Sequence, residues 1–121
     1  MTKRILVVED QEDNRRILRD LLTTVGYEIL EAEDGARGVT AAEVERPDLI
    51  LMDIQLPIMD GYEATRRIKA NPDLTAIPII VVTSYALSGD EDKARAAGCD
   101  DYITKPYSPR ALLAKIKQHL H

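Results

Sequence analysis

The stretch LILMD at residues 49–53 decides the fold, because it places four large apolar residues directly before a carboxylate. An unbroken apolar run of this length is typical of a strand that is buried on both faces, as in parallel sheets. The same pattern occurs earlier, in ILVV at 5–8, and later, in IPIIVV at 77–82. These three runs predict the central strands of a parallel sheet.

Helical patterns and two further apolar segments fill the rest of the chain. We expect additional strands at 27–32 and 102–104, and helices at 17–25, 36–45, 62–70, 88–97 and 112–120. Strands that alternate with helices in this way predict an open α/β sheet with right-handed crossovers. We also expect residues 1–121 to form one domain, with no room for an output domain.

The composition limits the partners of the chain. Its formal net charge is −5, which argues against nucleic acid or an anionic membrane as the main partner, since both require a basic surface. No stretch approaches the roughly 20 consecutive apolar residues of a transmembrane helix. Cys99 is the only cysteine, so no disulfide can form within the chain, and this fits a reducing cytoplasm.

Polar side chains follow four of the predicted strands. Glu9 and Asp10 follow the first strand, Asp53 the third, Thr83 the fourth and Lys105 the fifth. In a parallel α/β sheet, ligands bind outside the carboxyl ends of the strands, so these groups converge on one edge. Taken alone, each has an ordinary alternative, since an acidic residue there also caps helices and threonine often ends strands. Their joint placement predicts a functional site.

Four short motifs carry a resemblance to a known family. They are VVED at 7–10, MDIQLPIMDG at 52–61, VTS at 82–84 and KP at 105–106. In this order they resemble the receiver domains of two-component response regulators, over nearly the whole chain. The expected lack of an output domain looks like the stand-alone regulators of chemotaxis and the cell cycle. The resemblance implies a flavodoxin-like, CheY-like, doubly wound sheet of order 2-1-3-4-5, with helices on both faces.

The resemblance implies a metal-dependent phosphorylation of Asp53. In the family pattern, Asp10, Asp53 and the main-chain carbonyl of Gln55 bind a divalent cation, and Glu9 acts mostly through a metal-bound water. Crowded carboxylates repel one another, and a cation relieves this repulsion. A set of oxygen ligands suits Mg²⁺ or Mn²⁺. Asp53 is expected to take its phosphoryl group from a phosphohistidine on a sensor histidine kinase or a histidine phosphotransfer protein.

The same resemblance implies roles for the other strand-end groups. Lys105 is expected to offset the charge of the phosphoryl group, and Thr83 to donate a hydrogen bond to it. Because phosphorylation adds about −1.5 to −2 charges, Thr83 then moves toward it and Tyr102 turns inward. The surface of the fourth helix, fifth strand and fifth helix changes, and a downstream protein binds there. Without the resemblance, Tyr102 is an ordinary edge-strand aromatic.

The docking surface is inferred in the same way. The kinase is expected to dock on the start of the first helix, near Asn14, Arg15 and Leu18, and on the loop at 106–107. The alternative is that these are plain solvent-facing residues. The chain is expected to catalyse only its own phosphorylation and dephosphorylation, so it is not a turnover enzyme. We expect it to be a monomer or a weak dimer.

Two side chains are expected to set the lifetime of the phosphoryl group. Gln55 lies two residues after Asp53, and Tyr85 lies two residues after Thr83. Both are expected to flank the path of the attacking water. The bulk of Tyr85 is expected to slow hydrolysis.

Rival functions have their own sequence requirements. A flavin- or nucleotide-binding α/β protein needs a glycine- or hydroxyl-rich loop after the first strand, whereas residues 9–13 read EDQED and repel phosphate. An aspartate-nucleophile phosphatase needs a second aspartate where this chain has Gln55. A receiver that serves only for docking would lack active-site residues that are all present here. These differences favour an active receiver.

Overall fold

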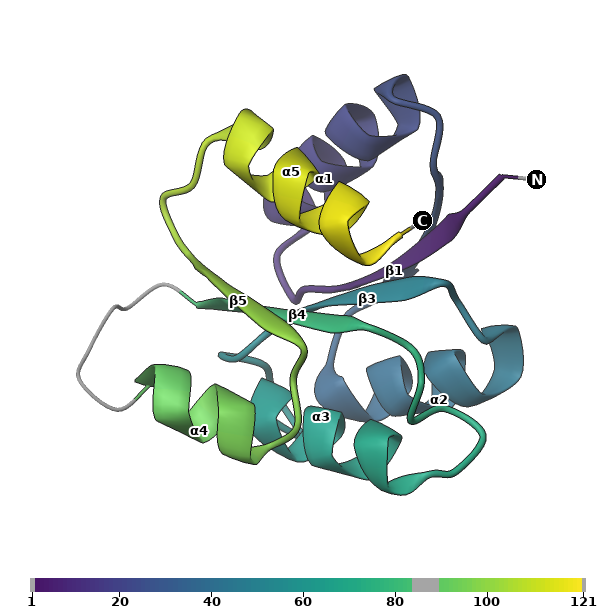
Figure 1. Ribbon diagram of the computed structural model, residues 1–121, viewed down its shortest axis with the longest axis vertical. Coiled ribbons are helices and arrows are strands. Elements are labelled where there is room, and N and C mark those ends of the chain that lie inside the picture. Colours follow the sequence, from purple (N-terminus) through teal and green to yellow (C-terminus); the bar gives the residue numbers. More distant parts are fainter. Residues whose placement is uncertain (1, 84–89, 121) are drawn as a thin grey trace.

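The computed structural model describes residues 2–83 and 90–120. These residues form a sheet of five parallel strands: β1 (Arg4–Val8), β2 (Glu28–Ala32), β3 (Leu49–Asp53), β4 (Ile79–Thr83) and β5 (Asp101–Thr104). The strands lie in the order β2-β1-β3-β4-β5 (Figure 1). The predicted order 2-1-3-4-5 is confirmed.

Helices cover both faces of the sheet. They are α1 (Glu12–Thr24), α2 (Gly35–Glu45), α3 (Gly61–Ala70), α4 (Asp90–Ala96) and α5 (Pro109–His119). Figure 1 shows α1 and α5 on one face and α2, α3 and α4 on the other. The doubly wound, flavodoxin-like α/β fold is therefore confirmed. Among the described residues, no helix is long and apolar enough to span a bilayer.

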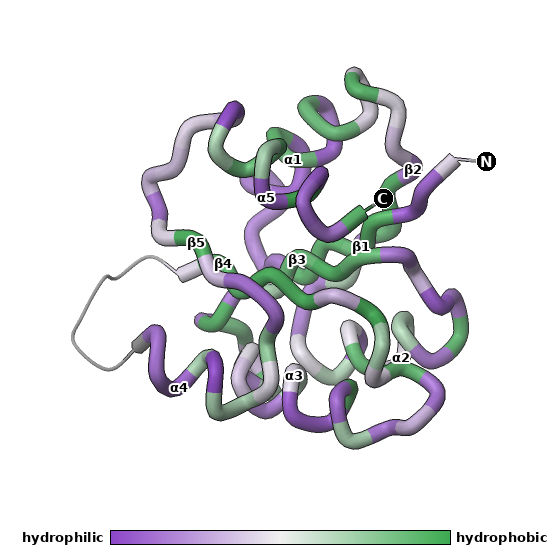
Figure 2. The backbone as a smooth tube through the Cα atoms, in the orientation of Figure 1, coloured by the Kyte–Doolittle hydropathy of each residue, from purple (hydrophilic) through white to green (hydrophobic). Residues whose placement is uncertain are grey.

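The core consists of two apolar layers, one on each face of the sheet. Side chains alternate along β1, so that Ile5 and Val7 pack with α1 and α5, whereas Leu6 and Val8 pack on the side of α2, α3 and α4. Every residue of β3 and β4 is buried, and Figure 2 shows these central strands as hydrophobic. The run LILMD thus lies between two layers of helices, and its terminal carboxylate reaches the edge of the sheet.

Some element boundaries differ from the predicted ones. The helix α5 starts at Pro109 rather than at 112, because Ser108 Oγ accepts a hydrogen bond from the Ala111 amide at 3.0 Å. The strand β4 starts at Ile79 rather than at 77. Of the predicted helix at 88–97, the described part runs from Asp90 to Ala96.

Lys69 closes the connection from α3 to β4. Its ammonium donates to the Ile77 carbonyl at 2.7 Å, to the Thr75 carbonyl at 3.1 Å and to the Asp100 carboxylate at 2.7 Å. Asp100 also accepts a hydrogen bond from the Ile79 amide at 2.8 Å. The replacement Lys69→Met should lower the free energy of unfolding by about 2 to 3 kcal/mol, because three acceptors lose a charged donor.

Urea denaturation of both proteins measures this difference. Arg66→Met on the same helix is the matched control, since Arg66 is exposed and pairs with Glu63 at 2.9 Å on the helix surface. The control should change the free energy of unfolding by less than about 0.5 kcal/mol. A loss in Lys69→Met no larger than the loss in Arg66→Met would contradict the assigned role of Lys69.

Candidate functional site

Three carboxylates meet at the carboxyl edge of the sheet. The register of β1 and β3 places Val8 beside Met52, so that Glu9 and Asp53 follow at adjacent positions. Carboxylate oxygens of Glu9, Asp10 and Asp53 lie within 4.8 Å of one another. Glu9 and Asp53 are buried, whereas Asp10 is exposed. The structure thus brings together the three acidic side chains that the sequence places after two different strands.

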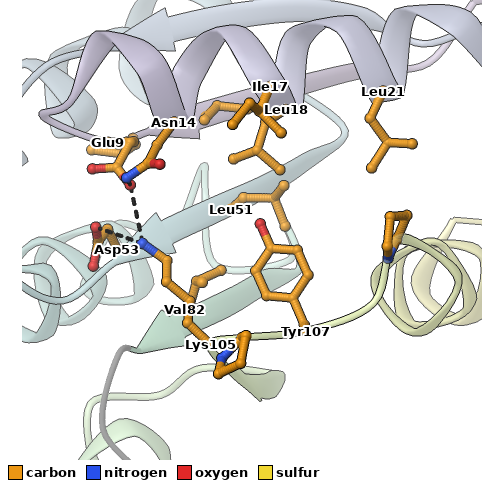
Figure 3. Close-up of a pocket in the computed structure, with 14 residues that line it drawn as sticks. Glu9, Asn14, Ile17, Leu18, Leu21, Leu51, Asp53, Val82, Lys105 and Tyr107 are labelled. Atoms are coloured by element: carbon orange, nitrogen blue, oxygen red, sulfur yellow. Dashed lines mark hydrogen bonds and ion pairs between the residues drawn. The ribbon is translucent and has the colours of Figure 1, made fainter.

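Lys105 reaches this acidic cluster from the residue that follows β5. Its ammonium nitrogen lies 3.1 Å from Glu9 Oε1 and 3.5 Å from Asp53 Oδ2, as the dashed lines in Figure 3 show. The Lys105 amide also donates to the Thr83 carbonyl at 2.6 Å, which ties this residue to the end of β4. The Lys105 ammonium therefore lies between two buried carboxylates.

The charges in the cluster shift the pKa values of its members. Burial, a hydrogen bond with Glu9 and repulsion by the Glu9 carboxylate raise the pKa of Asp10 above its ordinary value. Burial alone would lower the pKa of Lys105, but the attraction of Asp53 and Glu9 outweighs burial and raises it. The Lys105 ammonium thus stays charged, and Asp10 remains under repulsion that a further cation would relieve.

The donor set fits a hard divalent cation. Every member of the cluster offers a carboxylate oxygen, and oxygen ligands are those that Mg²⁺ prefers. Asp10 is open to solvent at this edge, so a hydrated ion can reach it. The cluster of Glu9, Asp10 and Asp53 therefore has the chemistry that a magnesium site requires.

The Glu9 carboxylate is held by donors from three parts of the chain. It accepts hydrogen bonds from the Gln11 amide at 3.2 Å, from Asn14 Nδ2 at 3.2 Å and from the Lys105 ammonium at 3.1 Å. The sequence pattern assigns Asn14 to the docking surface and does not reveal this contact. The sequence feature that could have indicated the contact is the separation of five residues between Glu9 and Asn14, which places the first turn of α1 next to the end of β1.

The loop after β3 is packed closely against the end of that strand. The Gln55 amide donates to Asp53 Oδ1 at 3.2 Å, and the Gly61 amide donates to the Ile54 carbonyl at 2.9 Å. A Cβ atom on Gly61 would lie 2.0 Å from the Asp53 carbonyl oxygen, so only glycine fits there. The role of the Gln55 carbonyl as a metal ligand stays a prediction.

The sequence also places the chain among known proteins. The family profile described as "Response regulator receiver domain" matches residues 5–117. The chain belongs to the response regulator receiver family. A curated relative of this receiver is the polar-differentiation response regulator DivK of Brucella ovis. It is 43% identical over 120 residues, which cover 99% of this chain and 98% of DivK.

Solved receiver domains share the fold of this receiver. The receiver domain of a signal transduction histidine kinase from Syntrophus aciditrophicus superposes with a TM-score of 0.93 at 35% identity, and the match covers 98% of this chain and 90% of that one. The receiver domain of the sensor histidine kinase PA1611 from Pseudomonas aeruginosa gives a TM-score of 0.91 at 38% identity, with 98% and 97% covered. That structure is described with a magnesium ion coordinated in its active site cleft. These matches confirm the resemblance and favour a receiver over a flavin-binding protein.

The two predicted switch residues of the receiver lie on neighbouring strands. Thr83 is buried at the end of β4 and lies beside Thr104 of β5. Tyr102 pairs with Val81 and is partly buried against the core layer of α2, α3 and α4. Tyr85 lies outside the described residues, so its proposed effect on hydrolysis stays a prediction.

A cavity of about 400 Å³ opens beside the acidic cluster, between α1 and the segment that follows β5. Most of its walls are apolar, and Glu9, Asp53 and Lys105 line its polar end. Figure 3 shows the ring of Tyr107 facing α1 across this space. Burial raises the pKa of the Tyr107 hydroxyl, so it stays neutral. The cavity thus extends from the predicted docking segments, α1 and residues 106–107, to the carboxylates of Glu9 and Asp53.

Two of the predicted docking residues are not on the surface. Arg15 and Leu18 are each only 7% exposed, because they lie on the face of α1 that packs toward the sheet. Ile17, which is 62% exposed, lines the cavity together with Asn14 and Leu18. The assignment of Arg15 and Leu18 to an exposed docking surface is therefore wrong, whereas docking at the start of α1 stays a prediction, with Ile17 as its exposed apolar residue.

Proposed function

We propose that this receiver is a phosphorelay response regulator whose Asp53 accepts a phosphoryl group in a Mg²⁺-dependent step. The proposal is carried by one observation, the meeting of Asp53 with the carboxylates of Glu9 and Asp10 and the ammonium of Lys105. The donor is a phosphohistidine on a sensor histidine kinase or a histidine phosphotransfer protein. Residues 1–121 act as one receiver unit in the cytoplasm.

Asp53 supplies the nucleophile. One of its carboxylate oxygens forms a bond to phosphorus while the P–N bond to the donor imidazole breaks, and the imidazole nitrogen keeps the electron pair. Phosphoryl transfer requires mainly alignment and neutralisation of charge. The Lys105 ammonium, which already lies between Glu9 and Asp53, supplies positive charge, and the Thr83 hydroxyl donates to the phosphoryl oxygens. The product is an aspartyl phosphate on the chain itself, so the protein is not a turnover enzyme.

The acidic cluster would hold the cation. Asp10, Asp53 and the main-chain carbonyl of Gln55 would bind Mg²⁺ or Mn²⁺ directly, and Glu9 would reach it through a water. When bound, the ion supplies positive charge against the phosphoryl oxygens. The indirect role of Glu9 is supported by its three hydrogen-bond donors from the protein, and the direct role of Asp10 is supported by its exposure.

The output is a change of the α4-β5-α5 face. Thr83 moves toward the phosphoryl group, Tyr102 turns inward, and a downstream protein binds the altered surface. Among the described side chains of α4, only Ala94 is buried, and a helix with so little buried apolar area moves at low cost. The net charge of −5 supports a protein target rather than nucleic acid or a membrane. The receiver acts as a monomer or a weak dimer.

The phosphodonor docks over the cavity beside α1. Ile17→Asp should slow transfer from a phosphorylated histidine phosphotransfer protein by at least about 10-fold, because it places a charge in an apolar contact. Transfer from acetyl phosphate, which docks no protein, should change by less than about twofold. Mixing the receiver with each radiolabelled donor and quenching at intervals measures both rates.

A control on the other face of the sheet separates docking from general effects of charge. Val44 on α2 is 72% exposed, so Val44→Asp adds the same charge far from the cavity. It should leave both rates unchanged. Equal rates for Ile17→Asp and Val44→Asp with the protein donor would refute the docking surface. A wild-type receiver that accepts nothing from phosphohistidine donors would contradict the proposed function.

A further inference from the structure

Arg15 is a buried arginine in the first turn of α1, with a side chain that is only 8% exposed. Its Nη1 donates to the main-chain carbonyl of Glu9 at 2.8 Å. A charged side chain is rarely buried unless its partners compensate for the lost hydration. The hydrogen bond to the Glu9 carbonyl therefore helps to compensate for the hydration that Arg15 loses on burial.

The other edge of the Arg15 guanidinium meets carboxylates from two more elements. Its Nη2 donates to Glu12 at the start of α1, its Nε lies 3.4 Å from Glu31 Oε1 of β2, and its Nη2 lies 3.9 Å from Glu33 Oε1. A planar guanidinium can hold several acceptors at fixed angles, which a lysine ammonium cannot do in the same way. The Arg15 side chain thus links the end of β1 to both β2 and α1.

Both polar groups of the Glu9 backbone are hydrogen-bonded. The Glu9 amide donates to the Ala32 carbonyl at 3.0 Å, and the Glu9 carbonyl accepts from Arg15. That carbonyl belongs to the peptide that leads directly into Asp10. A rotation of this peptide would move the Asp10 carboxylate relative to Asp53, and with it the spacing of the cluster.

We propose that Arg15 is a positioning residue for the divalent-cation site. It fixes the peptide between Glu9 and Asp10 and thereby sets the position of the Asp10 carboxylate. The inference rests on the proposed function, because it concerns the metal affinity of the same acidic cluster. Residues outside the ligand set that orient metal ligands typically change metal affinity by about 10- to 100-fold when they are replaced. Arg15 would affect the binding of the cation through the backbone of Glu9 rather than through its own charge.

Arg19 offers a matched control in the same ionic network. It contacts both Glu31 carboxylate oxygens, at 2.8 and 3.0 Å, and lies 3.6 Å from Glu12, but its hydrogen bonds and ion pairs among the described residues do not include Glu9. Arg19→Met therefore removes one positive charge from the same carboxylates and leaves the Glu9 peptide untouched. A general electrostatic effect would appear in both variants, whereas positioning would appear only at Arg15.

Isothermal titration with Mg²⁺ tests the proposal on the wild type, Arg15→Met, Arg15→Lys and Arg19→Met. Circular dichroism and urea denaturation establish that each protein is folded under the titration conditions. The Kd for Mg²⁺ should rise by about 10-fold or more in Arg15→Met and by at least about fivefold in Arg15→Lys. It should stay within about twofold of the wild type in Arg19→Met.

The outcomes distinguish this inference from the proposed function. A wild type with no measurable Mg²⁺ binding would contradict the metal site itself. A wild type that binds Mg²⁺ together with a folded Arg15→Met of unchanged Kd would overturn the role of Arg15, as would an equal rise in Arg19→Met. If Arg15→Met does not fold, Arg15→Lys decides, and an unchanged Kd in that variant overturns the proposal.

Discussion

Replacing Lys105 with methionine is expected to slow phosphorylation of Asp53 by acetyl phosphate by about 100- to 1000-fold. Methionine keeps an unbranched side chain of similar length but removes the ammonium that lies 3.1 Å from Glu9 and 3.5 Å from Asp53. That ammonium is the group already placed to meet the charge of an incoming phosphoryl group. Initial rates of phosphoryl incorporation under saturating Mg²⁺ measure the effect.

The Mg²⁺ affinity of the same variant separates loss of chemistry from loss of the metal. Without the positive charge of Lys105, the carboxylates of Glu9 and Asp53 attract a divalent cation at least as strongly as before, so Mg²⁺ binding should not weaken. Lys115→Met is the control, because Lys115 lies on α5 and its ammonium pairs with the Asp101 carboxylate of β5 at 3.0 Å. Its rate should change by less than about twofold. A rate for Lys105→Met as high as that for Lys115→Met would show that the ammonium has no part in the transfer.

Gly61→Ala is expected to lower the free energy of unfolding by about 3 kcal/mol and to abolish most of the phosphorylation. The added Cβ would lie 2.0 Å from the Asp53 carbonyl oxygen and 2.8 Å from the Ile54 Cα. Both contacts are with backbone atoms, so they are relieved only if the end of β3 and the phosphoacceptor shift. Urea denaturation and the acetyl phosphate assay measure the two effects.

Gly38→Ala provides the comparison within another helix. There the new Cβ would meet the Val8 methyl groups at 2.9 and 3.0 Å, which are side-chain atoms with some freedom to move. The higher helix propensity of alanine also offsets part of the clash. We expect a loss of about 1 kcal/mol or less. If the two variants lose equal stability, the tight packing of Gly61 against Asp53 is not the constraint inferred here.

The strands were predictable because this sheet is buried on both faces. The segments LILMD at 49–53 and ILVV at 5–8 carry no polar residue until the strand reaches the edge, so the pattern shows both the strand and where its chemistry begins. The motifs then indicated the strand order through the family resemblance. The convergence of Glu9, Asp53 and Lys105 follows from parallel strands that end at one edge.

Several contacts at the site and elsewhere in the fold were not predictable, because they join residues far apart in the sequence or depend on the rotation of a helix. The hydrophobic spacing of α1 identifies a helix but does not show that Arg15 turns inward onto the Glu9 carbonyl. Likewise, the link from Lys69 to Asp100 spans 31 residues and leaves no local pattern. The exposure of Ile17 follows from the same helix rotation.

The most direct test of the central claim is the intact mass of the protein after incubation with acetyl phosphate and Mg²⁺. The wild type is expected to gain the mass of one phosphoryl group, and excess EDTA is expected to prevent the gain. Asp53→Asn, which keeps the size of the side chain but lacks the carboxylate nucleophile, is expected to gain nothing. An equal gain in Asp53→Asn, or a wild type unchanged by both acetyl phosphate and a phosphorylated histidine phosphotransfer protein, would contradict the assignment of Asp53 as the phosphoacceptor.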